Sequence, residues 1–218
     1  MRFVRRLARP YFNRHWDIHE RGHGNVPETG PVIFASNHIG WLDGPLLFVR
    51  LPRGAHALVK EEEFVGRTGR LLNFAGQIKV SRTRNDTRAL RRAEAALAAG
   101  QAVLIYPEGT RGAGEFERFK CGVAWLALVS GAPIVPVAVF GTRQAGEPSE
   151  ARAPKGARID IVYGRPIQFP MRGWPRDRGM IENAGEQIRD HLRAHILWSK
   201  NVLKRELPGP LPRGSSDG

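Results

Sequence analysis

Residues 32–43 read VIFASNHIGWLD, and this stretch decides how the rest of the chain is interpreted. Residues 32–35 are apolar and partly β-branched, which predicts a buried strand. The polar residues that follow predict a strand-to-helix loop. Side chains five positions apart on one helix differ by about 500°, so they point some 140° apart and cannot touch in mid-helix. We therefore predict that His38 lies in the loop and that Asp43 folds back toward it from the first helical turn.

On both sides of this stretch, short β-branched runs alternate with helical patterns, which indicates an α/β sheet with helices on its faces. One long helix is expected at about 177–200, and another at 87–99, with Asn85 or Asp86 as its N-cap and Gly100 as its stop. Residues 121–142 carry no charge, but Gly131 and Pro133 divide them into a helix and a strand rather than one membrane span. The predicted strands are residues 32–35, 57–60, 77–81, 102–106, 134–139 and 158–163.

Composition bounds the class of protein. The chain has 218 residues, of which 41% are hydrophobic, so one folded domain with a real core is expected. A single cysteine excludes a disulfide framework and a cysteine-built zinc site. The net charge of +13 favours phosphate-bearing partners: nucleic acid, an anionic lipid surface or phosphorylated substrates. A general richness in arginine without a function is an equally open explanation of this charge.

Both ends of the chain differ from its middle. In residues 1–21 arginines alternate with apolar and aromatic residues, without the apolar run of a signal peptide. A helix of this kind could lie at a membrane interface or pack on its own domain, and Pro10 should kink or interrupt it. Residues 208–218 are rich in proline, glycine and serine and are expected to be disordered. The predicted organisation is a basic amphipathic segment at 1–21, a domain at 22–207 and a tail at 208–218.

Three segments could carry chemistry. A carboxylate at Asp43 would fix the tautomer of His38 and leave its other nitrogen as a general base. Because the pair has no serine or cysteine partner, the nucleophile would belong to the substrate. A second loop, residues 106–111 (YPEGTR), follows an apolar run, and there Glu108 could orient a hydroxyl and Arg111 could clamp a phosphate. Residues 76–82 (GQIKVSR) form a third case, a strand that ends in an arginine. Each of these segments taken alone is more often a cap, a turn or a solvated face.

Taken together and in this order, these blocks make the sequence resemble the 1-acylglycerol-3-phosphate (lysophosphatidic acid) acyltransferase family, within the phospholipid/glycerol acyltransferases. The resemblance covers roughly residues 30–166. The motifs of that family match four parts of this sequence: Asn37-His38 with Asp43, residues 76–82, residues 107–111, and residues 135–137 with Gly141. Gly40 and Gly112 stand where the family usually has serine, which leaves the identity of the acceptor open.

The resemblance implies a fold and an activity. The fold would be a single α/β domain with a central mixed, mostly parallel sheet flanked by helices, like glycerol-3-phosphate acyltransferase. The activity would be transfer of a fatty acyl group from acyl-CoA or acyl carrier protein to the free hydroxyl of 1-acylglycerol 3-phosphate, giving phosphatidic acid for phospholipid biosynthesis. Neither a metal nor another cofactor is expected, because a thioester is already activated.

The resemblance also assigns roles to residues. His38 would be the general base, worth about 10² to 10⁴ in rate, and Asp43 would hold its ring. Lys60, Arg82 and Arg111 would grip the acceptor phosphate. The acceptor's glycerol backbone would be placed by the remaining binding residues, Glu108, Gly109 and Thr110.

Two further expectations concern partners and rival functions. The basic surface would hold the protein peripherally on anionic lipid at the cytoplasmic side of the cell membrane. The acceptor could instead be glycerol 3-phosphate, another lysophospholipid or a glycolipid, or the protein could be a basic lipid-binding module without catalysis. Nucleic acid is not an expected partner, because the chain has no recognisable reading motif and only 8% aromatic residues.

Overall fold

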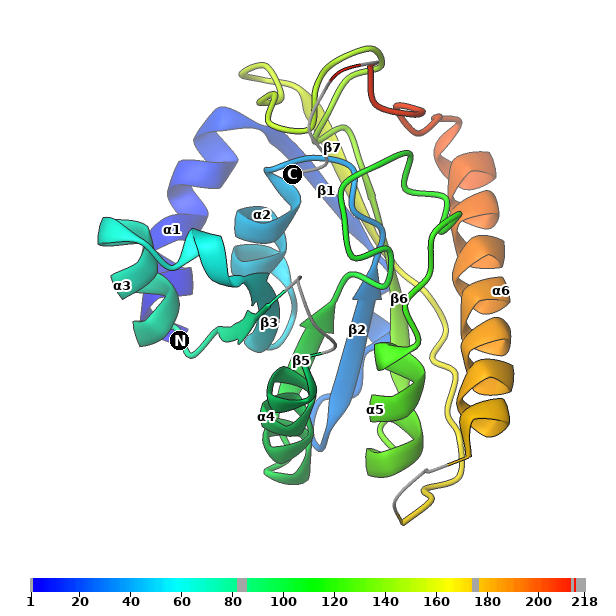
Figure 1. Cartoon of the computed structure of the whole chain (residues 1–218). Helices are drawn as coiled ribbons and strands as arrows, with labels where there is room; N and C mark the ends of the chain where they lie inside the picture. The colour runs from blue at the N-terminus through cyan, green and yellow to red at the C-terminus, as the bar shows by residue number, and fades with distance from the viewer. Residues whose placement is uncertain (1, 82–85, 174–176, 213, 215–218) are drawn as a thin grey trace.

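The computed structural model describes residues 2–81, 86–173, 177–212 and 214, which form one mixed sheet with helices on both faces (Figure 1). The strands are β1 (Asp17–Arg21), β2 (Val32–Ser36), β3 (Ala55–Lys60), β4 (Ile78–Val80), β5 (Ala102–Ile105), β6 (Ile134–Phe140) and β7 (Arg158–Tyr163). The helices are α1 (Arg2–His15), α2 (Asp43–Arg50), α3 (Gly66–Phe74), α4 (Thr87–Ala98), α5 (Gly122–Ser130) and α6 (Arg178–Leu203), with 3₁₀ turns at His23–Asn25 and Glu61–Glu63.

The strand order is β1-β7-β6-β2-β5-β3-β4. β2 lies in the centre, parallel to both β5 and β6, and β3 and β4 continue the parallel run on one side. β7 is antiparallel to β6, and β1 pairs with β7 in parallel. The predicted fold class, a mixed but mostly parallel sheet flanked by helices, is confirmed.

Alternating residues of the central strands supply two separate cores. Ile33 and Ala35 of β2 pack with α4, α5 and α6 on one face. Val32 and Phe34 of the same strand pack with α1 and α2 on the other face. A strand buried on both sides reads as a continuous apolar run, which is why residues 32–35 were recognisable from the sequence.

The predicted helix caps and the division of residues 121–142 are also confirmed. Asp86 caps α4 by accepting from the backbone N–H groups of Arg88 and Ala89, and Asn85 lies outside the described residues. α5 ends at Gly131, whose φ of 63° lies in the left-handed region that favours glycine, and β6 follows. None of the described helices is both long and apolar enough to cross a membrane.

The structure differs from the sequence-based expectations at both ends. Residues 17–21 form β1 and belong to the sheet, so the fold has no boundary after residue 21. α1 continues through Pro10, because Arg5 and Phe12, one on each side of it, anchor the helix to the domain. In the expected disordered tail, the carbonyl of Gly209 accepts a hydrogen bond from Arg143 (2.6 Å), so this part lies against the domain. The tail residues 213 and 215–218 lie outside the described residues.

Candidate active site

The sheet brings the two main motifs together. β2 and β5 are adjacent and parallel, with Ala35 opposite Ile105, so the loops that follow them leave the same edge of the sheet. His38 comes from the first loop and Glu108 from the second. Ligand sites in α/β sheets typically lie outside these carboxyl ends. The neighbouring loop after β6 supplies two further residues, Thr142 and Arg143.

His38 and Asp43 meet as predicted. The imidazole Nδ1 lies 2.9 Å from Oδ2 of Asp43, which is the first residue of α2. The Asp43 carboxylate is fully buried, and the His38 side chain is 14% exposed. With the proton on Nδ1 donated to Asp43, Nε2 is the nitrogen that can accept a proton. The geometry therefore suits a general base, and the catalytic role of the pair stays a prediction.

Asp43 is held by more donors than the histidine alone. Its Oδ2 also accepts from the backbone N–H groups of Ile39 (2.7 Å) and Gly40 (2.9 Å). Its other oxygen accepts from the hydroxyl of Thr142. These donors fix the direction of the carboxylate, because hydrogen bonds to an ionised group are the strong ones. The loop around the imidazole is consequently preorganised.

Arg143 is a buried support that the sequence analysis missed. Its guanidinium donates to the carbonyls of Ile39 (2.6 Å), Gly112 (3.0 Å), Glu147 (2.8 Å) and Gly209 (2.6 Å). It thus ties the His38 loop to the loop after β5 and to the C-terminal segment. Thr142 and Arg143 follow a strand without any motif spacing. About a hundred residues separate Thr142 from Asp43 and Arg143 from Ile39, so no sequence signal pointed to them.

Glu108 contacts the protein's own backbone. It is 6% exposed, and its Oε1 accepts from the backbone N–H of His38 (2.9 Å). Burial raises the pKa of this carboxyl to about 7, and the charge of Asp43 adds to the rise. Hydrogen bonds from the backbone N–H groups of His38, Gly114 and Phe116 act in the opposite direction. Glu108 therefore positions the His38 loop, and the expected contact with the acceptor's glycerol stays a prediction.

Glycine at position 109 is required by the turn. Its φ is 73°, and a Cβ there would lie 2.5 Å from Cε of Lys120. Its N–H donates to the carbonyl of Tyr106 (3.0 Å), which closes the turn of the loop. The loop then returns to the His38 loop, where the N–H of Gly112 donates to the carbonyl of His38 (2.8 Å). Thr110 lies on this loop and is partly exposed.

Two of the predicted phosphate-binding residues, Lys60 and Arg111, lie near the same carboxylate. Nζ of Lys60 lies 3.5 Å from Glu63, and Arg111 lies 3.9 Å from the same Glu63 oxygen. Arg111 also pairs with Glu150 at 3.1 Å. Arg82, the third predicted phosphate ligand, lies outside the described residues. Among the described residues, no group of three or more histidine, cysteine or acidic side chains is placed to hold a metal ion.

A large cavity of about 1090 Å³ joins these groups. Its polar wall includes His38, Lys60, Glu63 and Arg111. Most of the remaining wall is apolar, and it comes from helices α1 to α5 (Figure 1) and from strands β3 to β5. This apolar wall includes Val4, Ala8 and Phe12 of α1, Phe48 and Val49 of α2, and Leu71 and Leu72 of α3. A polar wall beside a long apolar wall suits an amphiphile.

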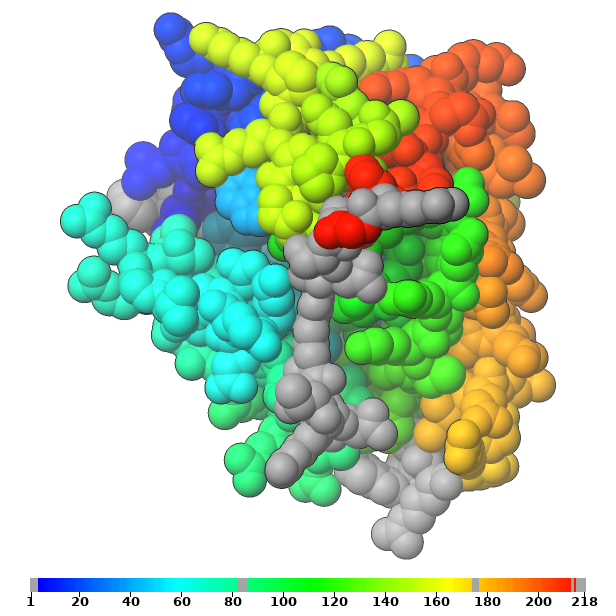
Figure 2. Space-filling model, turned by 45° about the horizontal axis from the view of Figure 1, so that its top comes forward, coloured from blue at the N-terminus to red at the C-terminus, as the bar shows by residue number. Residues whose placement is uncertain are grey.

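α1 is both packed and exposed. Phe12 is buried, and Arg5 donates to the backbone carbonyls of Phe48 (2.8 Å) and Leu51, which anchors the helix to α2. Leu7 and Tyr11 are 66% and 55% exposed, beside the exposed arginines Arg6, Arg9 and Arg14. α3 lies on the same side of the molecule as α1 (Figures 1 and 2). It exposes Leu71 and Phe74. Of the two alternatives for this helix, packing holds for the face with Arg5 and Phe12, and contact of the exposed face with a membrane interface stays a prediction.

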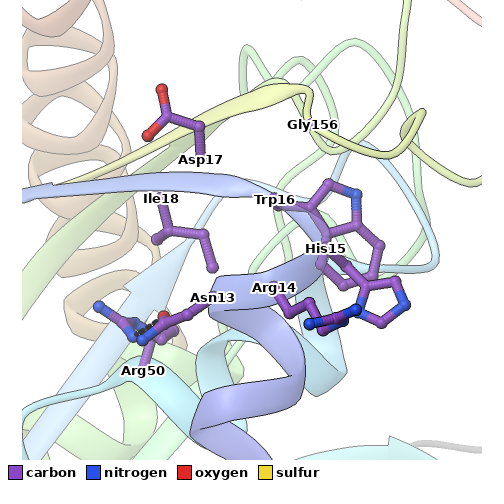
Figure 3. A pocket seen from close by; sticks show the side chains of 8 residues that line it. All are labelled: Asn13, Arg14, His15, Trp16, Asp17, Ile18, Arg50 and Gly156. Carbon is purple, nitrogen blue, oxygen red and sulfur yellow. Dashed lines mark hydrogen bonds between the residues drawn. The ribbon is translucent and has the colours of Figure 1, made fainter.

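A smaller hollow of about 490 Å³ lies where α1 meets β1 (Figure 3). Arg50 donates to Asn13 (2.8 Å) and to Glu20 (2.5 Å) there, so its charge is already paired. Arg14 and His15 line another part of the hollow. The hollow contains none of the residues predicted to bind substrate.

Comparison with known proteins agrees with the motif order. The family model described as Acyltransferase matches residues 17–140. A 1-acyl-sn-glycerol-3-phosphate acyltransferase of Chlamydomonas reinhardtii is 30% identical over 152 residues, covering 63% of this chain and 46% of that protein. One from Limnanthes alba is 30% identical over 183 residues, covering 81% and 61%. The chain thus spans about half the length of the curated relatives it matches.

Two other similarities concern the acceptor and the fold. A lyso-ornithine lipid O-acyltransferase of Pseudomonas aeruginosa is 32% identical over 133 residues, covering 60% of this chain and 50% of that protein. The crystal structure of the 1-acyl-sn-glycerophosphate (LPA) acyltransferase PlsC from Thermotoga maritima superposes with a TM-score of 0.70 at 21% identity. That superposition covers 94% of this chain and 80% of the other, and it supports the fold.

Proposed function

Because the chain belongs to the acyltransferase family, we propose that it transfers a fatty acyl group from a thioester to the free hydroxyl of 1-acylglycerol 3-phosphate. The observation that carries this proposal is the contact between His38 and buried Asp43 at the wall of a mostly apolar cavity. The product would be phosphatidic acid, which supplies phospholipid biosynthesis. The donor would be acyl-CoA or acyl carrier protein, and no metal or other cofactor takes part in the proposed reaction.

The reaction needs one base and no enzyme nucleophile. Nε2 of His38 takes the proton from the acceptor hydroxyl while the hydroxyl oxygen attacks the thioester carbonyl carbon. The new C–O bond forms, the C–S bond breaks, and the imidazolium returns the proton to the departing thiolate. Asp43 stabilises the imidazolium between these two steps and holds the orientation of the imidazole ring.

The cavity provides separate places for the two ends of the lipid. Lys60 and Arg111 would face the acceptor phosphate, because both line the polar wall next to His38. The apolar wall would hold the acyl chains, whose burial supplies the binding energy for orientation. The exposed residues of α1, together with the net charge of +13, would keep the protein peripherally on anionic lipid at the cytoplasmic side of the membrane.

A product survey tests this function. The purified protein is mixed with palmitoyl-CoA or palmitoyl carrier protein and an equimolar set of lysolipids, including lysophosphatidate, and glycerol 3-phosphate. Mass spectrometry should find phosphatidic acid as the main product. Absence of every acylated product, combined with tight binding to anionic vesicles, would support the lipid-binding module instead.

A second acceptor class is favoured by the carboxylates of the polar wall. Glu63 accompanies both Lys60 and Arg111, and Glu150 also pairs with Arg111, so these four groups carry no net charge together. The amine of a headgroup could donate hydrogen bonds to these carboxylates, and a lyso-ornithine lipid has such a headgroup. The survey would establish this second class if the protein consumes an amine-bearing lysolipid faster than lysophosphatidate and if Glu63→Gln loses this preference.

A further inference from the structure

Tyr106 stands directly against the proposed base. It follows the last residue of β5, and its ring lies parallel to the imidazole of His38, with 4.0 Å between ring centroids and 19° between ring planes. It also lines the large cavity. Stacking of this kind needs only an aromatic ring. Phenylalanine would supply the same ring, so the hydroxyl of Tyr106 calls for a separate explanation.

The hydroxyl is buried and has no hydrogen-bond partner in the described part of the chain. Buried hydroxyl groups normally have a hydrogen-bond partner, because without one nothing offsets the free energy lost when the group leaves water. A second unpaired donor, Nε of Arg111, belongs to the same cavity wall. The remaining buried atom of this kind in the described residues, the hydroxyl oxygen of Ser199, belongs to α6, away from the residues that line the cavity. Two donors on one wall without protein acceptors indicate an oxygen that arrives with a ligand.

The charge around Tyr106 determines what its hydroxyl can do. Burial raises the pKa of the phenol well above its usual range, and the carboxylate of Asp43 raises it further, while Arg111 opposes the rise. The hydroxyl therefore keeps its proton at neutral pH. It can donate a hydrogen bond to a negative oxygen, but it cannot replace His38 as the base.

The proposed reaction creates such an oxygen next to His38. The acceptor hydroxyl that is bound to Nε2 must come within bonding distance of the thioester carbonyl carbon, so the carbonyl oxygen also lies near the imidazole. Attack moves an electron pair onto this oxygen, and collapse of the intermediate moves the pair back as the C–S bond breaks. Preorganised donors at this point act mainly on the transition state.

We propose that Tyr106 is a catalytic residue whose hydroxyl, beside the His38 imidazole, donates a hydrogen bond to the thioester carbonyl oxygen as it becomes an oxyanion. The phenol keeps its own proton throughout, so the proton balance of the His38 mechanism is unchanged. This inference rests on the proposed acyl transfer, but it does not depend on which lysolipid is the acceptor.

The kinetic test is Tyr106→Phe, which keeps the stacked ring and removes one oxygen. The expected result is a fall in kcat of about 10²-fold with little change in KM, for lysophosphatidate and for a phosphate-free monoacylglycerol alike. The matched control is Tyr163→Phe, which removes another buried hydroxyl, 3.4 Å from Glu20 and outside the cavity wall. An unchanged kcat in Tyr106→Phe would overturn the proposal. A rise in KM for lysophosphatidate alone would also overturn it, by assigning the hydroxyl to the acceptor phosphate.

A binding test separates this inference from the proposed function. Two analogues of the acyl donor, each made on coenzyme A and on acyl carrier protein, are titrated calorimetrically. One has an anionic tetrahedral phosphonate in place of the thioester carbonyl, and the other has a thioether without a carbonyl oxygen. Tyr106→Phe should bind the phosphonate at least about tenfold more weakly and the thioether as the unsubstituted protein does. Equal binding of both analogues by the two proteins would reject the role of Tyr106 alone. Failure of the unsubstituted protein to bind either analogue on either carrier would reject the acyl-transfer function together with this role.

Discussion

At the scale of single residues, the site depends on one carboxylate that organises its surroundings. Asp43 accepts from the imidazole of His38, from two backbone N–H groups of the same loop and from Thr142. A side chain with so many donors fixes the tautomer of the imidazole as well as its position. Removing the charge of Asp43 should therefore damage catalysis more than folding.

Asp43→Asn tests this expectation. The amide would turn an N–H group toward Nδ1 or leave backbone donors unpaired, so the imidazole would carry its proton on Nε2 and lose its function as a base. We expect kcat for acyl transfer to fall by about 10⁴-fold, as when a buried orienting carboxylate is replaced by its amide. Thermal unfolding serves as the control for folding. A kcat within threefold of that of the unsubstituted protein would remove Asp43 from the mechanism.

Glu108 predicts a dependence of stability on pH. Its pKa is raised from 4.5 to about 7 in the folded protein, so the folded state holds this proton more tightly than the unfolded state does. The resulting stabilisation is fully present below pH 4.5 and is lost as the pH rises through 7, by up to roughly 3 kcal/mol. Glu108→Gln does not titrate, so the difference in unfolding free energy between the two proteins should change between pH 5 and pH 8. A difference that is constant over this range would contradict the raised pKa.

At the scale of elements, the central strands were predictable and the edge strand was not. β2 and β6 are buried on both faces and appear in the sequence as apolar runs. β1 has the sequence Asp-Ile-His-Glu-Arg and pairs with a single neighbour, so neither periodicity nor composition marked it as a strand. The parallel pairing with β7 and the adjoining α1 hold it in place. Long-range pairing of this kind overrides local propensity.

α1 carries the prediction that belongs to this scale. Replacing exposed Leu7 and Tyr11 by aspartate removes apolar surface and adds charges that anionic lipid repels. We expect sedimentation with phosphatidylglycerol vesicles to weaken, while thermal unfolding changes little because Phe12 and Arg5 still anchor the helix. The matched control is the same double substitution at Leu197 and Trp198 of α6, which are 61% and 54% exposed. Equal vesicle binding by the two double variants would show that the exposed face of α1 does not contact lipid.

At the scale of the whole molecule, the sequence predicted the meeting of His38 and Asp43 but not their surroundings. The two residues are five positions apart, so a strand, a loop and the first helical turn were enough to bring them together. The cavity is different, because its apolar wall comes from helices α1 to α5 and strands β3 to β5, which meet only after the chain has folded. The pairing of Glu63 with Lys60 and Arg111 likewise appears only in three dimensions.

The whole architecture places one base between a polar wall and an apolar cavity. The most direct test is the rate of thiol release from palmitoyl-CoA or palmitoyl carrier protein, measured with and without the acceptor that the product survey identifies, for the unsubstituted protein and for His38→Ala. Release by the unsubstituted protein should require the acceptor, and His38→Ala should release thiol at least 10²-fold more slowly while it still binds anionic vesicles. Release that continues unchanged in His38→Ala would contradict the central claim.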